Sequence, residues 1–180
     1  MIPKKIHYVW VGNKPKPPFV LACIKSWRKH LPDYEIIEWG NDCLDKINNR
    51  YAIEAYNNEC WAFVSDYIRL YALHHHGGIY LDTDVEVTKK FDSFLSFDFF
   101  SSHEVFHGKT LPITSAVLGA TKNNSIIKDL LDIYQNSRFI IKRQRDLTPN
   151  TLRITEYFKN KFNITPPFMA DDSIFLSKKG

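Results

Sequence analysis

The chain has 180 residues, 44% of them hydrophobic, and a formal net charge of +4, which fits a single domain, residues 1–180, with one sizeable core. Lysines and arginines are scattered along the chain rather than gathered in one stretch, which argues against a nucleic-acid partner. This charge still suits an anionic substrate or a weak approach to an acidic membrane surface.

The three cysteines are widely spaced and form no Cys-x-x-Cys pair, which predicts reduced, mostly buried thiols in a reducing compartment and argues against a zinc site. The N-terminus lacks the apolar core of a signal peptide, and no apolar run approaches the roughly 20 residues that span a bilayer. We therefore expect a soluble, cytoplasmic protein, with peripheral attachment to a membrane left open.

The first predicted elements are a strand, a helix and a second strand. Residues 6–11 are rich in β-branched and aromatic side chains and predict a buried strand that ends at Gly12. The apolar positions of residues 19–30 have helical spacing, and a second strand is predicted over 34–39. This order is typical of the start of a parallel, doubly wound sheet and indicates the α/β class.

The strongest predicted helix is Trp61–His76, which ends where Gly77 and Gly78 supply C-cap chemistry. The same periodicities predict the remaining elements, which are short helices over 41–49 and 52–57, strands over 79–81, 98–103, 113–118 and 174–176, and helices over 124–134 and 151–162.

Two carboxylates, Asp82 and Asp84, follow the predicted strand at 79–81. Because side chains i and i+2 of a strand share a face, both acids are expected together at its carboxyl end, where open α/β sheets bind ligands. Two like charges need a cation or strong donors between them, and oxygen ligands suit Mg2+ or Mn2+ that also binds phosphate. A lone Asp-x-Asp is more often a solvated turn, but the Gly-Gly break and the strand before it favour a metal–diphosphate site.

Ser65, Asp66 and Arg69 share one flank of the Trp61–His76 helix. This flank is offset from the apolar stripe, so we expect that the acid and the base do not both lie in the core. One interpretation is a surface ion pair worth under about 1 kcal/mol. The other is that Arg69 binds a phosphate or a sugar hydroxyl while Asp66 accepts from sugar hydroxyls.

Trp10 lies at the end of the first predicted strand. It is either a core residue or a planar ring on which a base stacks. The three consecutive histidines 74–76 are not expected to bind a metal together, because consecutive side chains on a helix diverge.

Several of these motifs occur in an order that resembles a known family. The segments that carry the resemblance are 2–11, 23–27, 32–39, 62–70 and 77–84. Together they resemble the DXD-containing sugar transferases of glycosyltransferase family 32. That family includes fungal mannosyltransferases and bacterial capsule or lipopolysaccharide enzymes, and the glucosylating domains of large clostridial toxins are more distantly similar.

The resemblance implies a GT-A fold, which is a Rossmann-like mixed sheet flanked by helices, and an enzyme of the hexosyltransferase class. It implies transfer of a hexose, with retention of anomeric configuration, from a UDP- or GDP-hexose donor to a saccharide acceptor. It further implies Mn2+ or Mg2+ as cofactor, a role in capsule or lipopolysaccharide synthesis, and a place in the cytoplasm or at the inner face of the membrane.

Position by position, the resemblance implies that Trp10 stacks on the base, with the backbone of Val9 beside it, and that Tyr80 lines the donor pocket with Ser65 nearby. Asp66 and Arg69 would hold the donor sugar. Asp82 would contact the ribose and, through water, the metal, and Asp84 would ligate the metal directly. The implied catalytic residues are Asp66, Arg69, Asp82 and Asp84, and the implied metal ligands are Asp82 and Asp84.

The chain departs from the family pattern in two places. Family members commonly carry an asparagine in the predicted strand where this chain has residues 114–116, so a polar sugar contact is not expected there. They also usually continue past the point that corresponds to Gly180, so we expect a short member or one that lacks a C-terminal segment.

Two other functions are left open. A phosphatase with an aspartyl nucleophile also uses a strand followed by Asp-x-Asp, but it normally has threonine where this chain has Glu86. A non-catalytic nucleotide-sugar binder or assembly protein would share the donor pocket without turnover. No catalytic base is evident, so we expect the acceptor hydroxyl to lose its proton to the departing phosphate.

Overall fold

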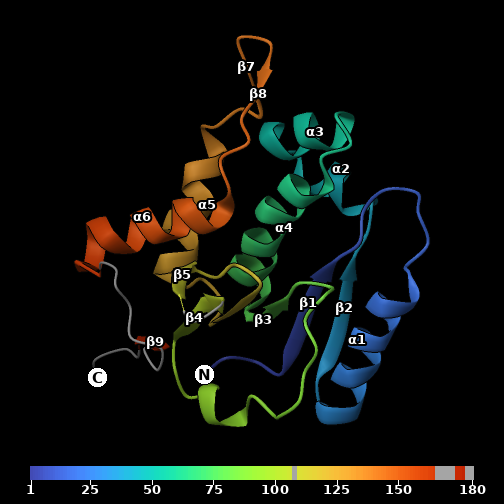
Figure 1. Cartoon of the computed structure of the whole chain (residues 1–180), viewed down its shortest axis with the longest axis vertical. Helices are drawn as coiled ribbons and strands as arrows, with labels where there is room; N and C mark the ends of the chain where they lie inside the picture. Colours follow the sequence, from blue (N-terminus) through green and yellow to red (C-terminus); the bar gives the residue numbers. More distant parts are fainter. Residues whose placement is uncertain (107–108, 165–172, 177–180) are drawn as a thin grey trace.

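The computed structural model describes residues 1–106, 109–164 and 173–176 (Figure 1). Within them, a seven-stranded sheet has the order β2-β1-β3-β6-β4-β5, with β9 paired to β4. Its strands are β1 (Lys5–Val9), β2 (Glu35–Trp39), β3 (Gly78–Leu81), β4 (Phe99–Phe106), β5 (Lys109–Ile113), β6 (Val117–Ala120) and β9 (Ser173–Leu176).

The helices of the described ranges are α1 (Pro18–His30), α2 (Cys43–Ile47), α3 (Arg50–Asn57), α4 (Trp61–His76), α5 (Ser125–Gln135) and α6 (Asn150–Phe162). A 3-10 turn spans Asp92–Phe94, and β7 (Ile140–Ile141) with β8 (Gln144–Arg145) forms a separate two-stranded sheet. None of the helices in these ranges combines the length and the apolar character needed to cross a bilayer.

The predicted strand–helix–strand opening is confirmed. β1 pairs in parallel with β2 on one side and with β3 on the other, while β6 is antiparallel to both β3 and β4. The sheet is therefore mixed, as the family resemblance implied.

Alternating side chains give the sheet one core on each face. On β1, Ile6 and Tyr8 pack with Trp27 of α1, and all three side chains are buried. Val9 and Tyr80 instead belong to the core that α4, α5 and α6 share. Figure 1 shows α1 and α4 on opposite sides of the sheet. The polar site described below lies where these two layers meet the ends of the strands.

The junction between α4 and β3 requires glycine. Gly77 has φ of 64°, and a Cβ there would lie 2.6 Å from the backbone nitrogen of Lys122. The carbonyl of Gly77 accepts a hydrogen bond of 2.8 Å from His7 Nε2, and His7 Nδ1 accepts one of 3.1 Å from Trp39 Nε1. Burial lowers the pKa of His7 to about 4, so the ring stays neutral and holds this junction.

The structure differs from the predicted elements in three respects. The strand expected over 113–118 is divided, because β5 ends at Ile113, β6 begins at Val117, and the segment between them crosses from one strand to the other. β1 ends at Val9 rather than at Gly12. The β7–β8 hairpin was not predicted, since two residues on each side are too few to show a period.

Candidate functional site

A pocket of about 510 Å³ opens at the carboxyl ends of β1 and β3, where the start of α4 faces them. Parallel pairing explains this position, because the carboxyl ends of parallel strands lie at the same edge of a sheet. Most of the predicted site residues line it, namely Val9, Trp10, Ser65, Arg69, Tyr80, Asp82 and Asp84.

Arg69 is the most connected side chain of the pocket wall, and only 3% of its surface is exposed. Its Nη2 lies 3.0 Å from Asp66 Oδ1 and 3.3 Å from Asp82 Oδ1, so one cation compensates two carboxylates. Nη1 donates to the Ser115 carbonyl over 2.6 Å, and Nε and Nη2 donate to the carbonyl and hydroxyl of Ser65. Arginine suits this position because its planar group carries five donors.

The expectation that Asp66 and Arg69 do not both lie in the core is wrong. Asp66 is also buried, because α4 packs against the sheet on one side and against α3 and α5 on others, which leaves this flank covered. Burial raises the pKa of Asp66 to about 6, while the nearby Arg69 lowers it. Asp66 does not line the pocket and contacts it through the arginine.

Asp82 is held from two sides at the end of β3. Its Oδ1 accepts from the Tyr80 hydroxyl over 2.8 Å, and its Oδ2 lies 3.4 Å from Arg69 Nη1. The Arg69 guanidinium also lies 4.6 Å from the centre of the Tyr80 ring, and burial raises the pKa of Tyr80 well above its usual value. Tyr80 is therefore a neutral donor that fixes the carboxylate.

The prediction that Asp82 and Asp84 share one face of a strand is wrong. The strand ends at Leu81, and the two acids lie in a turn in which the carbonyl of Asp82 accepts from the backbone nitrogen of Val85 over 3.1 Å. Both still line the pocket. Asp84 is exposed, and it makes no hydrogen bond or ion pair to the residues that the structure describes. Of the two acids it is the one whose oxygens are available.

The residues fit a divalent cation that brings further ligands with it. Within the described ranges, no three histidine, cysteine or acidic side chains gather into a complete ligand set. Asp84 offers a free carboxylate, while both oxygens of Asp82 are engaged by Arg69 and Tyr80. One direct protein ligand and one that acts through water is a donor set that Mg2+ or Mn2+ accepts when substrate oxygens complete the shell.

The loop after β1 forms the opposite wall. Trp10 is partly exposed, and its indole nitrogen donates to the Lys14 carbonyl over 3.0 Å. Gly12 has φ of 93°, and its nitrogen donates to Asn41 Oδ1 over 2.8 Å. A Cβ on Gly12 would lie 3.1 Å from the Trp61 ring, and with this positive φ any other residue would strain the loop.

Several residues of the site were not predicted. Asn41, Trp61 and Glu59 hold or line the loop side, and Ser115 contributes a backbone carbonyl. The contact of Ser115 could not be predicted, because a backbone carbonyl is the same in every residue type. Asn41 and Glu59 could have been suggested weakly by the sequence, since polar residues beside a strand end or a helix start often bind a ligand.

Helix α1 fixes the segment that follows the acids. Trp27 Nε1 donates to the Val85 carbonyl over 2.7 Å, and the Ser26 hydroxyl accepts from the Val87 nitrogen over 2.9 Å. The turn that carries Asp84 is therefore tied to a helix on the other face of the sheet.

Comparison with known proteins supports the family resemblance. Residues 17–101 match the family model described as the glycosyltransferase sugar-binding region containing the DXD motif. The chain is 27% identical to Subversion of eukaryotic traffic protein A of Legionella pneumophila, over 76% of this chain and 25% of that protein. It is 26% identical to an uncharacterised glycosyltransferase of Acanthamoeba polyphaga mimivirus, over 98% of this chain and 73% of that protein.

Among solved structures, the PaToxG glycosyltransferase has 20% sequence identity and a TM-score of 0.65, over 90% of this chain and 70% of that one. This likeness shows the fold, which is the GT-A fold that the sequence resemblance implied. The chain spans only about a quarter of the Legionella relative. The predicted family resemblance is confirmed by the match of residues 17–101 to the DXD-containing sugar-binding region of glycosyltransferases.

Proposed function

We propose that the chain is a metal-dependent hexosyltransferase that takes a nucleotide-sugar donor and a saccharide acceptor. The observation that carries this proposal is the charge of the pocket. Its lining has three carboxylates, Glu59, Asp82 and Asp84, against two cations, Lys14 and Arg69. Asp66 adds a further negative charge beside Arg69 at neutral pH. A diphosphate entering such a pocket requires a divalent cation between itself and the acids.

The shape of the site supports a nucleotide next to that cation. Trp10 offers a partly exposed aromatic face on the loop wall, suited to stacking on a base. Lys14 lies on the same wall and can meet a phosphate. In this arrangement the base binds at the loop side of the pocket and the sugar binds at the Arg69 side.

The cation would be held by Asp84 directly and by Asp82 through water. When bound, it would neutralise charge on the departing diphosphate as a Lewis acid. Arg69 adds a fixed positive charge that needs no reorganisation, because its contacts to Asp66, Asp82 and the Ser115 carbonyl already hold it. In this proposal Asp66 sets the position of Arg69, and Arg69 helps to hold the donor sugar.

The family resemblance is the basis for proposing retention of anomeric configuration and a saccharide acceptor. We propose that the acceptor hydroxyl passes its proton to the leaving phosphate. Glu59, which lines the pocket, is the rival base, and it would favour inversion instead. Nuclear magnetic resonance of the product anomer separates these two routes. The same resemblance supports cell-surface polysaccharide synthesis in the cytoplasm or at the inner face of the membrane.

The test uses thermal shift and donor hydrolysis. The wild-type chain is heated with UDP- or GDP-hexoses, with and without Mn2+, because a ligand that binds only the folded state raises the melting temperature. We expect a shift for one nucleotide class that requires the metal, together with slow release of free hexose. Asp84→Asn should lose the metal-dependent shift and lower hydrolysis at least about a hundredfold.

Asp45→Asn is the matched control, since it removes an exposed aspartate outside the pocket. It should behave as the wild type. If Asp84→Asn keeps full activity at saturating donor and Mn2+, the metal role is wrong. A metal-dependent shift without any hydrolysis would instead indicate a nucleotide-sugar binder.

A further inference from the structure

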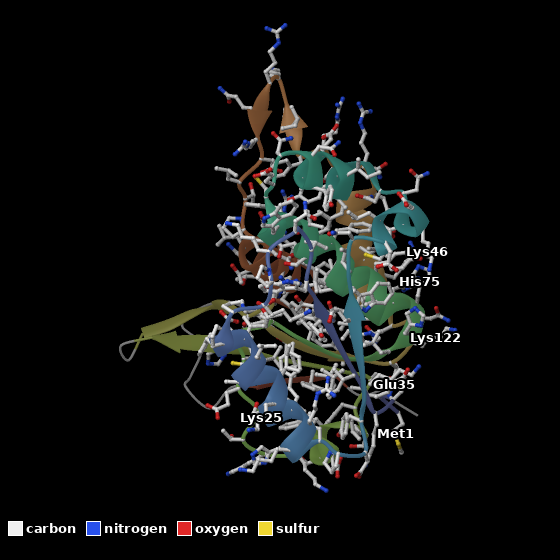
Figure 2. All side chains as sticks on the ribbon, turned by 90° about the vertical axis from the view of Figure 1, so that its right-hand side faces the viewer. Met1, Lys25, Glu35, Lys46, His75 and Lys122 are labelled. Atoms are coloured by element: carbon white, nitrogen blue, oxygen red, sulfur yellow. The ribbon has the colours of Figure 1, made fainter. Side chains whose placement is uncertain are left out.

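The β7–β8 hairpin projects from one end of the molecule, beyond α3 and α5 (Figures 1 and 2). A two-stranded hairpin alone is only marginally stable, so its base must be held. The nitrogen of Ile140 donates to Glu54 Oε2 over 3.0 Å, and the nitrogen of Asp146 donates to the Phe139 carbonyl over 2.8 Å. The hairpin is therefore anchored at its base on α3 and free of the sheet at its tip.

The turn at the tip does not have the residues that its backbone favours. Ile141 pairs with Gln144, which leaves Lys142 and Arg143 as a two-residue loop, and these have φ of 48° and 68°. Such a turn strongly prefers asparagine and glycine, because both central residues take positive φ. Lys142 and Arg143 are energetically unfavourable in this turn because both have positive φ. Residues kept in strained backbone at exposed positions point to a function.

Charge compensation stops at the base of the hairpin. Arg138 pairs with Glu54 and Arg153 pairs with Asp146. The tip is different: Lys142, Arg143 and Arg145 are exposed and make no ion pair with any residue of the described ranges. Beside them, Ile141 leaves 51% of its surface exposed. The tip, residues 141–145, thus presents three free cations and one aliphatic side chain on a convex projection.

We propose that this tip binds the surface of an anionic membrane. A projection suits a flat surface, whereas an acidic peptide would need a groove. Clustered basic residues are attracted to anionic headgroups, and a neighbouring aliphatic side chain can enter the interface. Membrane binding is inferred from the hairpin alone and does not depend on the proposed transferase activity.

The position of the hairpin relates the membrane to the pocket. Its base is bonded to α3, and the turn between α3 and α4 carries Glu59, which lines the pocket. Bound through its tip, the chain would hold this end of the molecule against the membrane. If the proposed function is right, an acceptor displayed at a lipid surface could reach the pocket.

The experiment is vesicle sedimentation of the full chain without donor or metal. We expect binding to phosphatidylcholine vesicles that contain 30% phosphatidylglycerol, weakening as salt rises, and little binding to pure phosphatidylcholine. Each basic residue near such a surface is worth roughly fivefold in affinity. The triple variant Lys142→Glu, Arg143→Glu, Arg145→Glu should therefore lose about a hundredfold or more.

The matched control reverses three exposed lysines elsewhere, Lys25, Lys29 and Lys89, with the same change in net charge. Figure 2 shows Lys25 toward the opposite end of the molecule from the hairpin. A second variant, Lys142→Asn with Arg143→Gly, removes two charges while giving the turn its preferred residues. It should fold at least as stably as the wild type and bind anionic vesicles about 25-fold more weakly.

Two results would overturn the proposal. One is equal loss of vesicle binding in the hairpin and control triples, which would mean that net charge alone is responsible. The other is no vesicle binding by the wild type at low salt, together with tip-dependent binding to polyglutamate, which would assign the hairpin to an acidic protein partner.

Discussion

At the scale of single residues, the site depends on how Arg69 is shared. The guanidinium is buried and compensates Asp66 and Asp82 while it donates to two backbone carbonyls. Its charge is thus already balanced before any ligand arrives, and its position is fixed by the fold. A group with this many partners is needed for stability as well as for binding.

Replacing Arg69 with methionine should therefore destabilise the fold by about 3–5 kcal/mol, because it leaves a buried carboxylate without its partner. Urea denaturation at neutral pH measures the loss. Arg69→Lys should recover only part of it, since a lysine cannot reproduce the planar set of donors. A full recovery by lysine would show that charge alone matters at this position.

The raised pKa of Asp66 predicts a pH dependence of stability. Because the folded-state pKa of about 6 lies above the ordinary value of 3.8, the folded state holds the proton more tightly than the unfolded state. This contribution is fully present below about pH 4 and is lost as the pH rises through about 6. Its size is on the order of 2–3 kcal/mol.

Comparing wild type with Asp66→Asn isolates this contribution. The difference in unfolding free energy between the two proteins should change in favour of the variant from pH 4.5 to pH 7.5. Urea denaturation at the two pH values checks it, and a difference that does not move with pH would contradict the assignment to Asp66.

At the scale of elements, the bounds of the helix before the acids were predicted correctly. The burial of the side chains on this helix was not. Trp61–His76 is long and is followed by two glycines, so local signals decide its limits. The burial of Asp66 and Arg69 depends instead on α3 and α5, which pack on α4 from elsewhere in the chain. A helix covered on almost all sides shows no clean polar flank.

The loop between β1 and α1 shows the same limit. Its role was suggested by Trp10, but its path is set by Asn41 and Trp61, which lie far along the sequence. Such tertiary contacts override local preference, so the strand was predicted two residues too long. Candidate site residues could be found by type and order, whereas the contacts that hold them required the structure.

Gly12→Ala tests this loop. Its positive φ and the nearby Trp61 ring should force residues 10–14 to move, and we expect nucleotide affinity to fall about tenfold or more with a smaller effect on stability. Isothermal titration calorimetry measures the affinity. Gly40→Ala is the control, because Gly40 lies outside this pocket and meets only the Asp42 carboxylate at 3.2 Å. Unchanged affinity for Gly12→Ala would exclude the loop from the nucleotide site.

At the scale of the whole molecule, the two helical layers cooperate across the sheet. α4 supplies Arg69 from one face, and α1 fixes the turn of Asp84 from the other through the Val85 carbonyl. The geometry of the turn that carries Asp84 therefore depends partly on Trp27 and Val85, neither of which lines the pocket.

Trp27→Phe should reveal this dependence. It leaves the Val85 carbonyl without its donor, which costs about 1–3 kcal/mol of stability, and it should weaken Mn2+-dependent donor binding severalfold. Tyr34→Phe is the control, since Tyr34 belongs to the same core and loses a 2.8 Å hydrogen bond to the exposed carboxylate of Asp92, away from the pocket. Equal donor affinity in the two variants would show that α1 does not position the acids.

The 2.6 Å bond from Arg69 to residue 115 ends on a peptide oxygen, which every amino acid supplies. Selection can therefore exchange the side chain at that position without loosening the arginine. Because the Ser115 side chain is itself buried, this freedom extends to small residues, and Ser115→Ala should leave both the fold and the arginine in place.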